Sequence, residues 1–166
     1  MAAGNKIGHS LVSVGKLTDV DTSLRNPLGA ELVDDNGNVY VYLTGVASTA
    51  AGDWVLYNAS SATSPWLTAR LLTTTVNGPV AVAMAAILAA QFGWYQVFGL
   101  TPTFTAITSD AAADGKVLSQ GATVGRLVTG SVTQKNIFGA VAIGAAASNT
   151  GTAFITYPYA AGTFTA

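Results

Sequence analysis

One histidine and eight carboxylates are the side chains of this 166-residue chain best suited to acid–base or metal chemistry. His9 is the only histidine, so a Ser-His-Asp arrangement would have to use it as its base. A catalytic base must be oriented by packed structure around it, and the first ten residues of a domain are commonly loose. We therefore interpret His9 as an ordinary residue of an N-terminal arm.

The carboxylates show no spacing typical of catalysis. Most lie in the first third of the chain, and the full set is Asp19, Asp21, Glu31, Asp34, Asp35, Asp53, Asp110 and Asp114. Their number permits the carboxylate pair of a glycosidase, but nothing in their spacing points to one. The chain has no cysteine, which excludes Cys-based metal and redox sites. We expect a protein without catalytic activity, cofactor or metal.

Acidic and amide side chains between residues 34 and 38 suggest either a calcium loop or a turn. An EF-hand loop needs a closing carboxylate at a fixed later position, and the next acidic residue here is Asp53. Asn36-Gly37 instead suits a type I′ turn, in which both central residues have positive φ. Since strand-forming residues flank this dipeptide, the pattern predicts a β-hairpin over residues 31–43.

Short runs of β-branched and aromatic residues predict further strands along the chain. They cover residues 52–58, 66–72, 80–86, 92–99, 101–107, 116–118, 122–128, 137–143 and 152–157. Turn signals recur roughly every 8–12 residues and no long helical period interrupts them, a pattern typical of sandwiches and barrels. The sequence therefore predicts an all-β domain over residues 29–166. We expect a compact β-sandwich or β-barrel of short antiparallel strands, with an extended N-terminal arm over residues 1–28.

The charged fraction is 9 %, against roughly 25 % in an ordinary soluble domain. A net charge of −1 gives no patch that could neutralise phosphates, so we expect no direct binding of nucleic acid. Two explanations of the low charge remain open. Either other protein chains cover much of the surface, or Ser and Thr hydroxyls solvate it. We favour the first, which predicts an oligomer or a place in a larger shell.

Residues 79–100 are uncharged and about as long as a membrane-spanning helix. Gln91 and Gln96 interrupt the stretch, and no Lys/Arg cluster flanks it. The first ten residues contain no continuous apolar segment after their lysine, so no secretory signal is predicted. We expect no membrane association.

Four segments together resemble the capsid decoration (cement) proteins of tailed bacteriophages. These are residues 52–55 (GDWV), 78–83 (GPVAVA), 89–99 (AAQFGWYQVFG) and 155–158 (ITYP). Ala90 stands where the family pattern has glycine. The resemblance implies a structural virion protein made in the host cytoplasm and bound to the capsid exterior, often as a homotrimer, where it bridges major capsid subunits. It also implies a compact β fold, and an arm that commonly reaches a neighbouring subunit.

Exposed aromatic side chains are the expected contact points with capsid or sister subunits. We predict Trp66, Phe92, Tyr95 and Phe98 for this role, with the alternative that each is an ordinary core residue left open. Trp54 and Trp94 are predicted core residues. In the segment 52–58, Trp54 and Leu56 should share one face and Val55 and Tyr57 the other.

A second hypothesis is a fibre or adhesin-type module that binds host surface glycans. Trp66, in a Ser/Thr-rich loop, is then the aromatic platform on which a sugar would stack.

Overall fold

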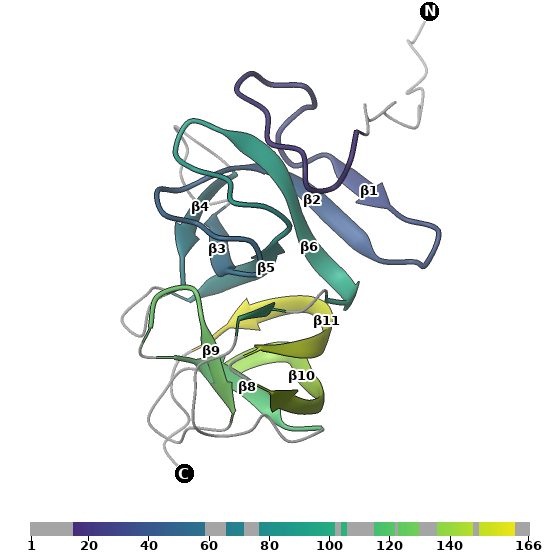
Figure 1. Ribbon diagram of the computed structural model, residues 1–166, viewed down its shortest axis with the longest axis vertical. Coiled ribbons are helices and arrows are strands. Elements are labelled where there is room, and N and C mark those ends of the chain that lie inside the picture. The colour runs from purple at the N-terminus through teal and green to yellow at the C-terminus, as the bar shows by residue number, and fades with distance from the viewer. Residues whose placement is uncertain are drawn as a thin grey trace, which may run out of the picture.

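The computed structural model describes residues 15–58, 66–71, 77–101, 104–105, 115–121, 123–129, 136–147 and 150–161. Within them the chain forms strands and turns without a helix, so the predicted all-β class is confirmed (Figure 1). The strands are β1 (Glu31–Val33), β2 (Val39–Thr44), β3 (Trp54–Asn58), β4 (Leu67–Arg70), β5 (Gly78–Ala83), β6 (Phe92–Leu100), β7 (Phe104–Thr105), β8 (Val117–Gln120), β9 (Leu127–Thr129), β10 (Asn136–Ala147) and β11 (Thr150–Ala160).

Six of the strands close into a barrel. Pairing runs β2–β4–β3–β5–β11–β6, and β6 pairs back with β2. Only the β2–β4 contact in this ring is parallel, through Thr44 and Leu67. Strands β10, β8 and β9 continue the sheet beyond β11, and β1 adds to β2. Closure gives the barrel strands partners on both sides, which removes the free edges of an open sheet.

The uncharged stretch 79–100 forms most of β5 and all of β6, which pair antiparallel. Val80 and Val82 alternate with alanine, a pattern that suits a strand buried on both faces. The predicted strand over 80–86 ends earlier, at Ala83, and a turn with Ala90 at a φ of 61° reverses the chain. No helix among the described residues is long and apolar enough to cross a membrane.

The predicted hairpin is present, but its turn differs from the expected type. Asp34 N donates to Asn38 O (3.0 Å) and Gly37 N donates to Asp34 O (3.0 Å). Gly37 has a φ of 80°, whereas Asn36 is not in the positive-φ region, so a two-residue type I′ turn is wrong. The loop has three central residues with glycine at the bulge position. The Asp34 carboxylate stabilises it by accepting from Asn36 N and Asn38 N, both at 2.9 Å.

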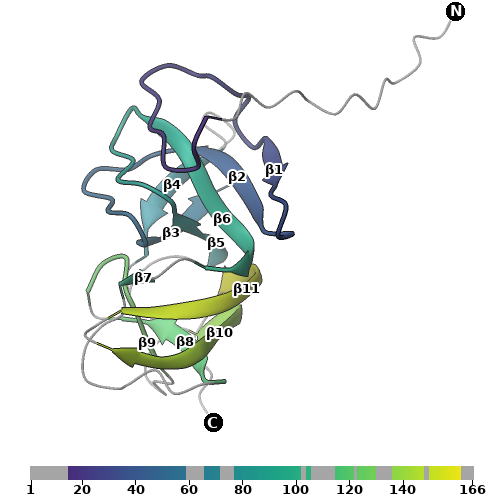
Figure 2. The same ribbon diagram turned by 45° about the vertical axis from the view of Figure 1, so that its right-hand side comes forward.

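Both faces of β3 and β5 are buried, so these strands separate two cores. One core fills the barrel and takes Val55 and Ala81 from the shared wall, together with residues of β2 and β6. The other takes Trp54 and Val82 from the opposite side of that wall and packs them against β8–β11. Figures 1 and 2 show the two lobes that enclose these cores. Because Trp54 is fully buried here, its predicted place in the core is confirmed.

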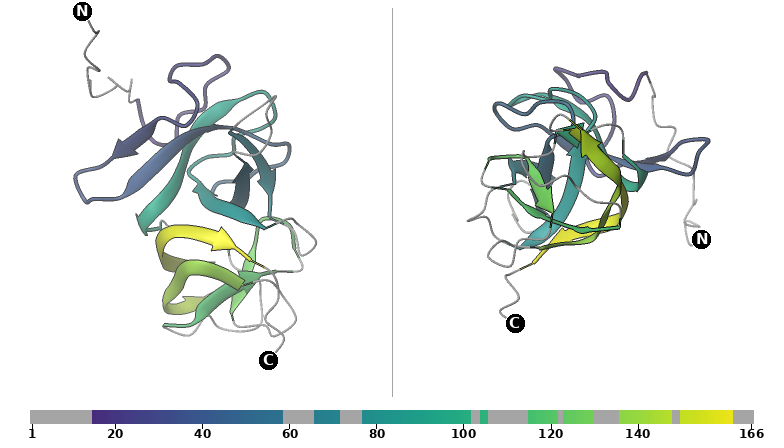
Figure 3. Two further views of the ribbon diagram at one scale, coloured as in Figure 1. Left: turned by 180° about the vertical axis from the view of Figure 1, so that it is seen from behind. Right: turned by 60° about the horizontal axis from the view of Figure 1, so that its bottom comes forward.

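A third cluster lies on the outside of β2 and β6. Tyr42 and Trp94 form it, with the rings 5.2 Å apart, and Leu17 and Leu28 pack against it. Trp94 is 3 % exposed, which confirms it as a core residue. The second half of the predicted arm, residues 15–28, thus lies against the barrel, while residues 1–14 lie outside the described residues. The β1–β2 hairpin projects beside this segment (Figure 3).

Hydrogen bonds and an ion pair attach residues 15–28 to the barrel. The Asp21 backbone exchanges two hydrogen bonds with Phe92, each 2.9 Å. The Tyr42 hydroxyl donates to the Asp21 carboxylate at 2.6 Å, and Arg25 pairs with the same carboxylate at 3.0 Å. Burial, and then the hydrogen bond to Asp21, raise the pKa of Tyr42 to about 12.

Replacing Leu118 by alanine should lower the free energy of unfolding by about 2–5 kcal/mol, because it leaves a cavity among buried side chains. Leu88→Ala is the matched control, since Leu88 is 45 % exposed at a turn, and it should cost less than about 1 kcal/mol. Urea unfolding monitored by tryptophan fluorescence measures both. Equal costs would contradict the described core.

Stability should decline at alkaline pH. Burial comes first among the causes that raise the pKa values of Tyr40 and Tyr42 from 10 to about 12, so the folded state favours their neutral forms. This stabilisation is fully present below pH 10 and is lost as the pH rises towards 12. Urea unfolding at intervals between about pH 8 and 11 measures it. In the Tyr42→Phe variant the loss of unfolding free energy at alkaline pH should be smaller than in the wild type. An equal loss would contradict the raised pKa of Tyr42.

Candidate functional site

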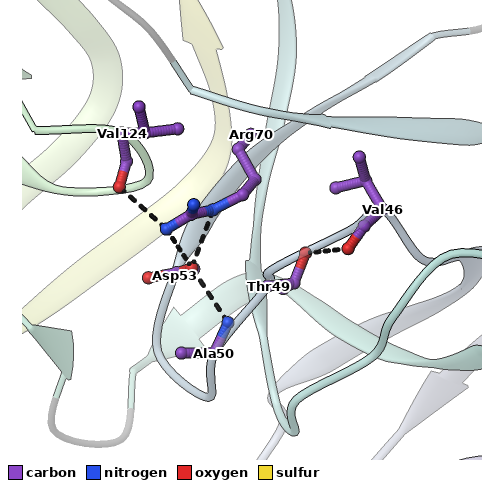
Figure 4. A network of polar contacts seen from close by, with 6 residues as sticks. All are labelled: Val46, Thr49, Ala50, Asp53, Arg70 and Val124. Carbon is purple, nitrogen blue, oxygen red and sulfur yellow. Dashed lines mark hydrogen bonds and ion pairs between the residues drawn. The ribbon is translucent and has the colours of Figure 1, made fainter.

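The buried carboxylate of Asp53 serves the fold. It accepts from Ala50 N at 2.9 Å and pairs with Arg70 at 2.9 Å, and Arg70 also donates to Val124 O at 3.1 Å (Figure 4). A Cβ at Gly125 would lie 2.9 Å from the Asp53 carboxyl carbon, so glycine lets this backbone approach the carboxylate. The network connects three segments of the chain that meet beside the shared wall.

The other described carboxylates do not assemble into a metal site. Asp21 pairs with Arg25, and Asp34 accepts from its own hairpin loop and from the Tyr40 hydroxyl. These hydrogen bonds hold the pKa of Asp34 below its usual value, with the Asn38 side chain the largest cause. Nowhere in the part of the chain that the structure describes do three potential ligands gather. His9, Asp110 and Asp114 lie outside the described residues.

Tyr95 is not a surface contact. It faces the barrel interior on β6 and is fully buried beside Val41 and Val97. Because side chains alternate along a strand, Tyr95 points inward while Trp94 points to the opposite side. Burial also raises the pKa of the Tyr95 hydroxyl. The prediction of a contact residue at Tyr95 is therefore wrong for this fold.

Phe92 and Trp66 are half-buried and flank Thr44 of β2, which pairs with Phe92 on one side and donates its backbone N–H to Trp66 O at 3.2 Å on the other. Phe92 stacks on Tyr42 at 6.4 Å, and its backbone is bonded to Asp21 of the N-terminal segment. Trp66 stacks on Tyr57 at 6.5 Å, and its ring also contacts Gly29, where a Cβ would lie 2.5 Å from it. Each ring thus already packs against its own chain.

Phe98 is the one predicted contact residue that lies beside a broad exposed apolar surface. Its ring is 5.9 Å from the rings of both Phe154 and Tyr157. We call this surface the apolar face, and its members lie on β6, β8, β10 and β11. They are Phe98, Leu100, Val117, Phe138, Val141, Ile143, Phe154, Tyr157 and Tyr159. Apart from Phe98, sequence reasoning missed all of them.

Strand register places four members of the apolar face in one row. Leu100 pairs with Phe154, Phe154 with Val141, and Val141 with Val117. Residues paired directly across strands have Cβ atoms about 5 Å apart on the same face. The row therefore crosses four neighbouring strands without a gap. The β6, β11 and β10 ribbons lie next to one another in Figure 2.

A β-bulge brings additional aromatic rings to this face. Between the pairs Phe138–Tyr159 and Ala140–Ile155, β11 holds three residues opposite the single residue Gly139. Tyr157 accordingly has a φ of 46°, and both it and its neighbour Thr156 are exposed. If side chains alternated strictly along β11, Tyr157 would point into the protein interior. The sequence feature that could have indicated the bulge was Pro158, because proline within a strand commonly marks a bulge or an edge.

The apolar face is uncharged and large. Strands β6, β10 and β11 contain no Asp, Glu, Lys or Arg, and Lys116 lies beside Val117 at the border. Seven side chains of the apolar face are 39–55 % exposed, and four of these seven are aromatic: Phe138, Phe154, Tyr157 and Tyr159. If a full aromatic side chain has an area of about 200 Å², the seven side chains together expose roughly 600 Å² of apolar surface. That is the upper end for a monomer, and patches of this size mark interaction sites.

An open groove of about 410 Å³ adjoins the apolar face. The hairpin residues Asn36 and Asn38 line one side of it, and Phe98, Leu100 and Phe154 line the other. Asn38 Oδ1 accepts from Leu100 N at 3.1 Å and so connects the hairpin to β6. Buried Gln96 supports the same strand end by donating to Leu100 O at 2.9 Å. The hydrogen bond between Asn38 and Leu100 thus fixes the position of the β1–β2 hairpin relative to the apolar face.

No protein-family model, curated protein or solved structure matches this chain. Among the described residues, the apolar face is the feature best suited to an interaction, because exposed apolar patches of this size mark protein, membrane or ligand interaction sites.

Gly99→Ala should lower the free energy of unfolding by at least about 1 kcal/mol more than Gly37→Ala. Both glycines have positive φ, 102° and 80°, so both substitutions strain the backbone. At Gly99 a Cβ would also overlap Asn38 Oδ1, whereas at Gly37 nothing lies within 4 Å. Urea unfolding of the two variants measures the difference. Equal costs would show that the hairpin does not lie against β6 as described.

Proposed function

We propose that this chain is a structural virion protein that binds the outer surface of a tailed-phage capsid and stabilises it by bridging major capsid subunits. The observation that carries the proposal is the uncharged apolar face on a closed β-barrel. A protein that acts through surface contact needs such a face and a rigid body to hold it. We name a tailed-phage capsid as the partner because four segments resemble decoration proteins. These segments are residues 52–55, 78–83, 89–99 and 155–158.

The mechanism is mechanical. Apolar burial contributes about 25 cal/mol per Å², so a few hundred Å² of contact contributes several kcal/mol before association costs of about 4–15 kcal/mol. One such contact is weak, but several contacts to neighbouring capsid subunits reinforce one another. A bridging subunit then opposes their separation under the outward pressure of a packaged genome.

The closed barrel supports this role because its strands resist relative movement. Each barrel strand has bonded neighbours on both sides, and the β3–β5 wall is packed on both faces. The Asp53–Arg70 pair and the Asn38–Leu100 hydrogen bond add connections between segments distant in sequence. A load applied at the apolar face is thereby carried by the whole body.

A glycan-binding module of a fibre or adhesin is the second candidate, and the groove beside the apolar face favours it. Asn36, Asn38, Phe98 and Phe154 are among the residues that line the groove, and none of its lining residues is charged. The Asn38 amide already bonds Leu100 N and the Asp34 carboxylate. Amides that bond hydroxyls, next to rings that stack on sugar faces, are the chemistry of neutral glycans. Binding of this chain to host cells but not to shells would favour this second function.

Co-sedimentation with undecorated shells tests the proposal. The shells are assembled from the major capsid protein of the same genome, and the chain should pellet with them and raise their disruption temperature. Phe154→Asp should reduce the bound fraction at least about 10-fold, because it places a charge on the apolar face. Leu88→Asp is the matched control and should bind like the wild type, since Leu88 lies near the opposite end of β6. Folded wild-type protein that never pellets with shells would refute the proposal.

A further inference from the structure

We propose that two copies of this chain pair through the apolar face about a two-fold axis. The inference goes beyond the proposed function and rests on it only in assigning this face to protein contact. A second copy covers the face in the free protein, and this pair must open before the same face can contact a shell. It concerns the purified chain alone, so it can be tested without a shell.

Charge selects a second copy as the occupant. The three strands that supply most of the face carry no charged residue, and the border contributes Lys116. A charged partner surface would lose its hydration against this face without gaining an ion pair. The same face of a second copy brings no charge to bury. The Tyr157 and Tyr159 side chains are about half exposed, at 55 % and 46 %, and each carries one hydroxyl that can stay hydrated at the rim.

The area also fits a pair. An interface of standard size buries about 800 Å² on each partner. The seven most exposed side chains of the apolar face already offer roughly 600 Å². Interfaces between identical subunits are also more apolar than transient ones. The face therefore supplies most of what one side of a stable homodimer requires.

The arrangement favours a two-fold pair over a three-fold ring. A ring needs two different complementary surfaces on each copy, whereas a two-fold contact uses one surface twice. Outside the apolar face, the exposed large hydrophobics among the described residues are divided among four parts of the chain. They are Val20 and Leu24 in the segment 15–28, Val33 on β1, Leu67 on β4 and Leu88 between β5 and β6. One apolar face on each copy thus leads to a closed pair rather than to the homotrimer that the family resemblance implies.

The row across the face complements itself in shape. Its order is Leu100, Phe154, Val141 and Val117, with the larger side chains in one half and the smaller ones in the other. A two-fold axis at the centre of the row sets two copies of it antiparallel. The larger side chains of each copy then lie over the valines of the other, as close packing requires.

Sedimentation equilibrium of the purified chain tests the pairing. We expect twice the chain mass of 16.8 kDa at micromolar concentration. Phe154→Asp and Tyr157→Asp should each weaken association by roughly 100-fold, and Leu88→Asp should leave it unchanged. Circular dichroism and the urea midpoint establish that each variant is folded. Tyr157 is 55 % exposed, so its variant remains informative if Phe154→Asp fails to fold.

A thiol cross-linking test locates the axis. The chain has no cysteine, so a single Val141→Cys variant can cross-link only to the same residue of a second copy. A bifunctional maleimide that spans about 10 Å, the separation of facing sheets, should convert it to a covalent dimer, because residue 141 is next to the centre of the row. Leu88→Cys is the control and should stay monomeric on a denaturing gel. Cross-linking of Leu88→Cys as efficient as that of Val141→Cys would overturn the location.

The outcomes separate the pairing from the proposed function. A wild-type monomer at 100 μM, or a mass three times that of the chain, would overturn the two-fold pair. So would a dimer that survives both aspartate substitutions. A dimer that binds no shells would refute the capsid role and leave the pairing intact, whereas a monomer that binds shells would do the reverse.

Discussion

Burial of both faces of β3 and β5 is the constraint on which the rest of this structure depends. Val55 and Ala81 point into the barrel, while Trp54 and Val82 point into the second core. A wall packed on both sides cannot meet water, so each core needs its own outer layer. Strands β2 and β6 provide one layer and β8–β11 provide the other. Among the described residues, the aromatic side chains that remain exposed all lie on the outward side of β10 and β11.

Small residues make the double burial possible, and they help to explain the unusual composition. Ala81 and Ala83 lie inside the barrel, and Ala140, Ala142 and Ala153 line the second core. Side chains this small leave room for large ones such as Trp54 and Tyr95 at close packing density. Part of the scarce charge goes into connections within the chain, at Asp53–Arg70 and Asp21–Arg25. The outer surface of three long strands is consequently without charge.

Local patterns predicted most of the elements, because their physical causes lie within a few residues. The strand predicted over 122–128 is wrong for residues 123–126, which form a turn before β9 begins at Leu127. The all-β class, the hairpin at 31–43, and the opposite faces of Trp54 and Val55 are all confirmed. The turn type was wrong because the Asp34 side chain holds a longer loop than Asn36-Gly37 alone suggests. Tyr95 was misplaced because a strand with aromatic residues on both faces does not say which face is the interior.

By itself the sequence determined the class of the fold, most of the strand-forming segments, the core tryptophans and a surface poor in charge. These properties follow from period, propensity and composition, which are local or additive. Only the tertiary structure decided that β6, β11, β10 and β8 are neighbours in this order and register. The apolar face is a product of that register. Leu100, Phe154, Val141 and Val117 are far apart along the chain, and a shift of one residue in any strand would point its contribution inward.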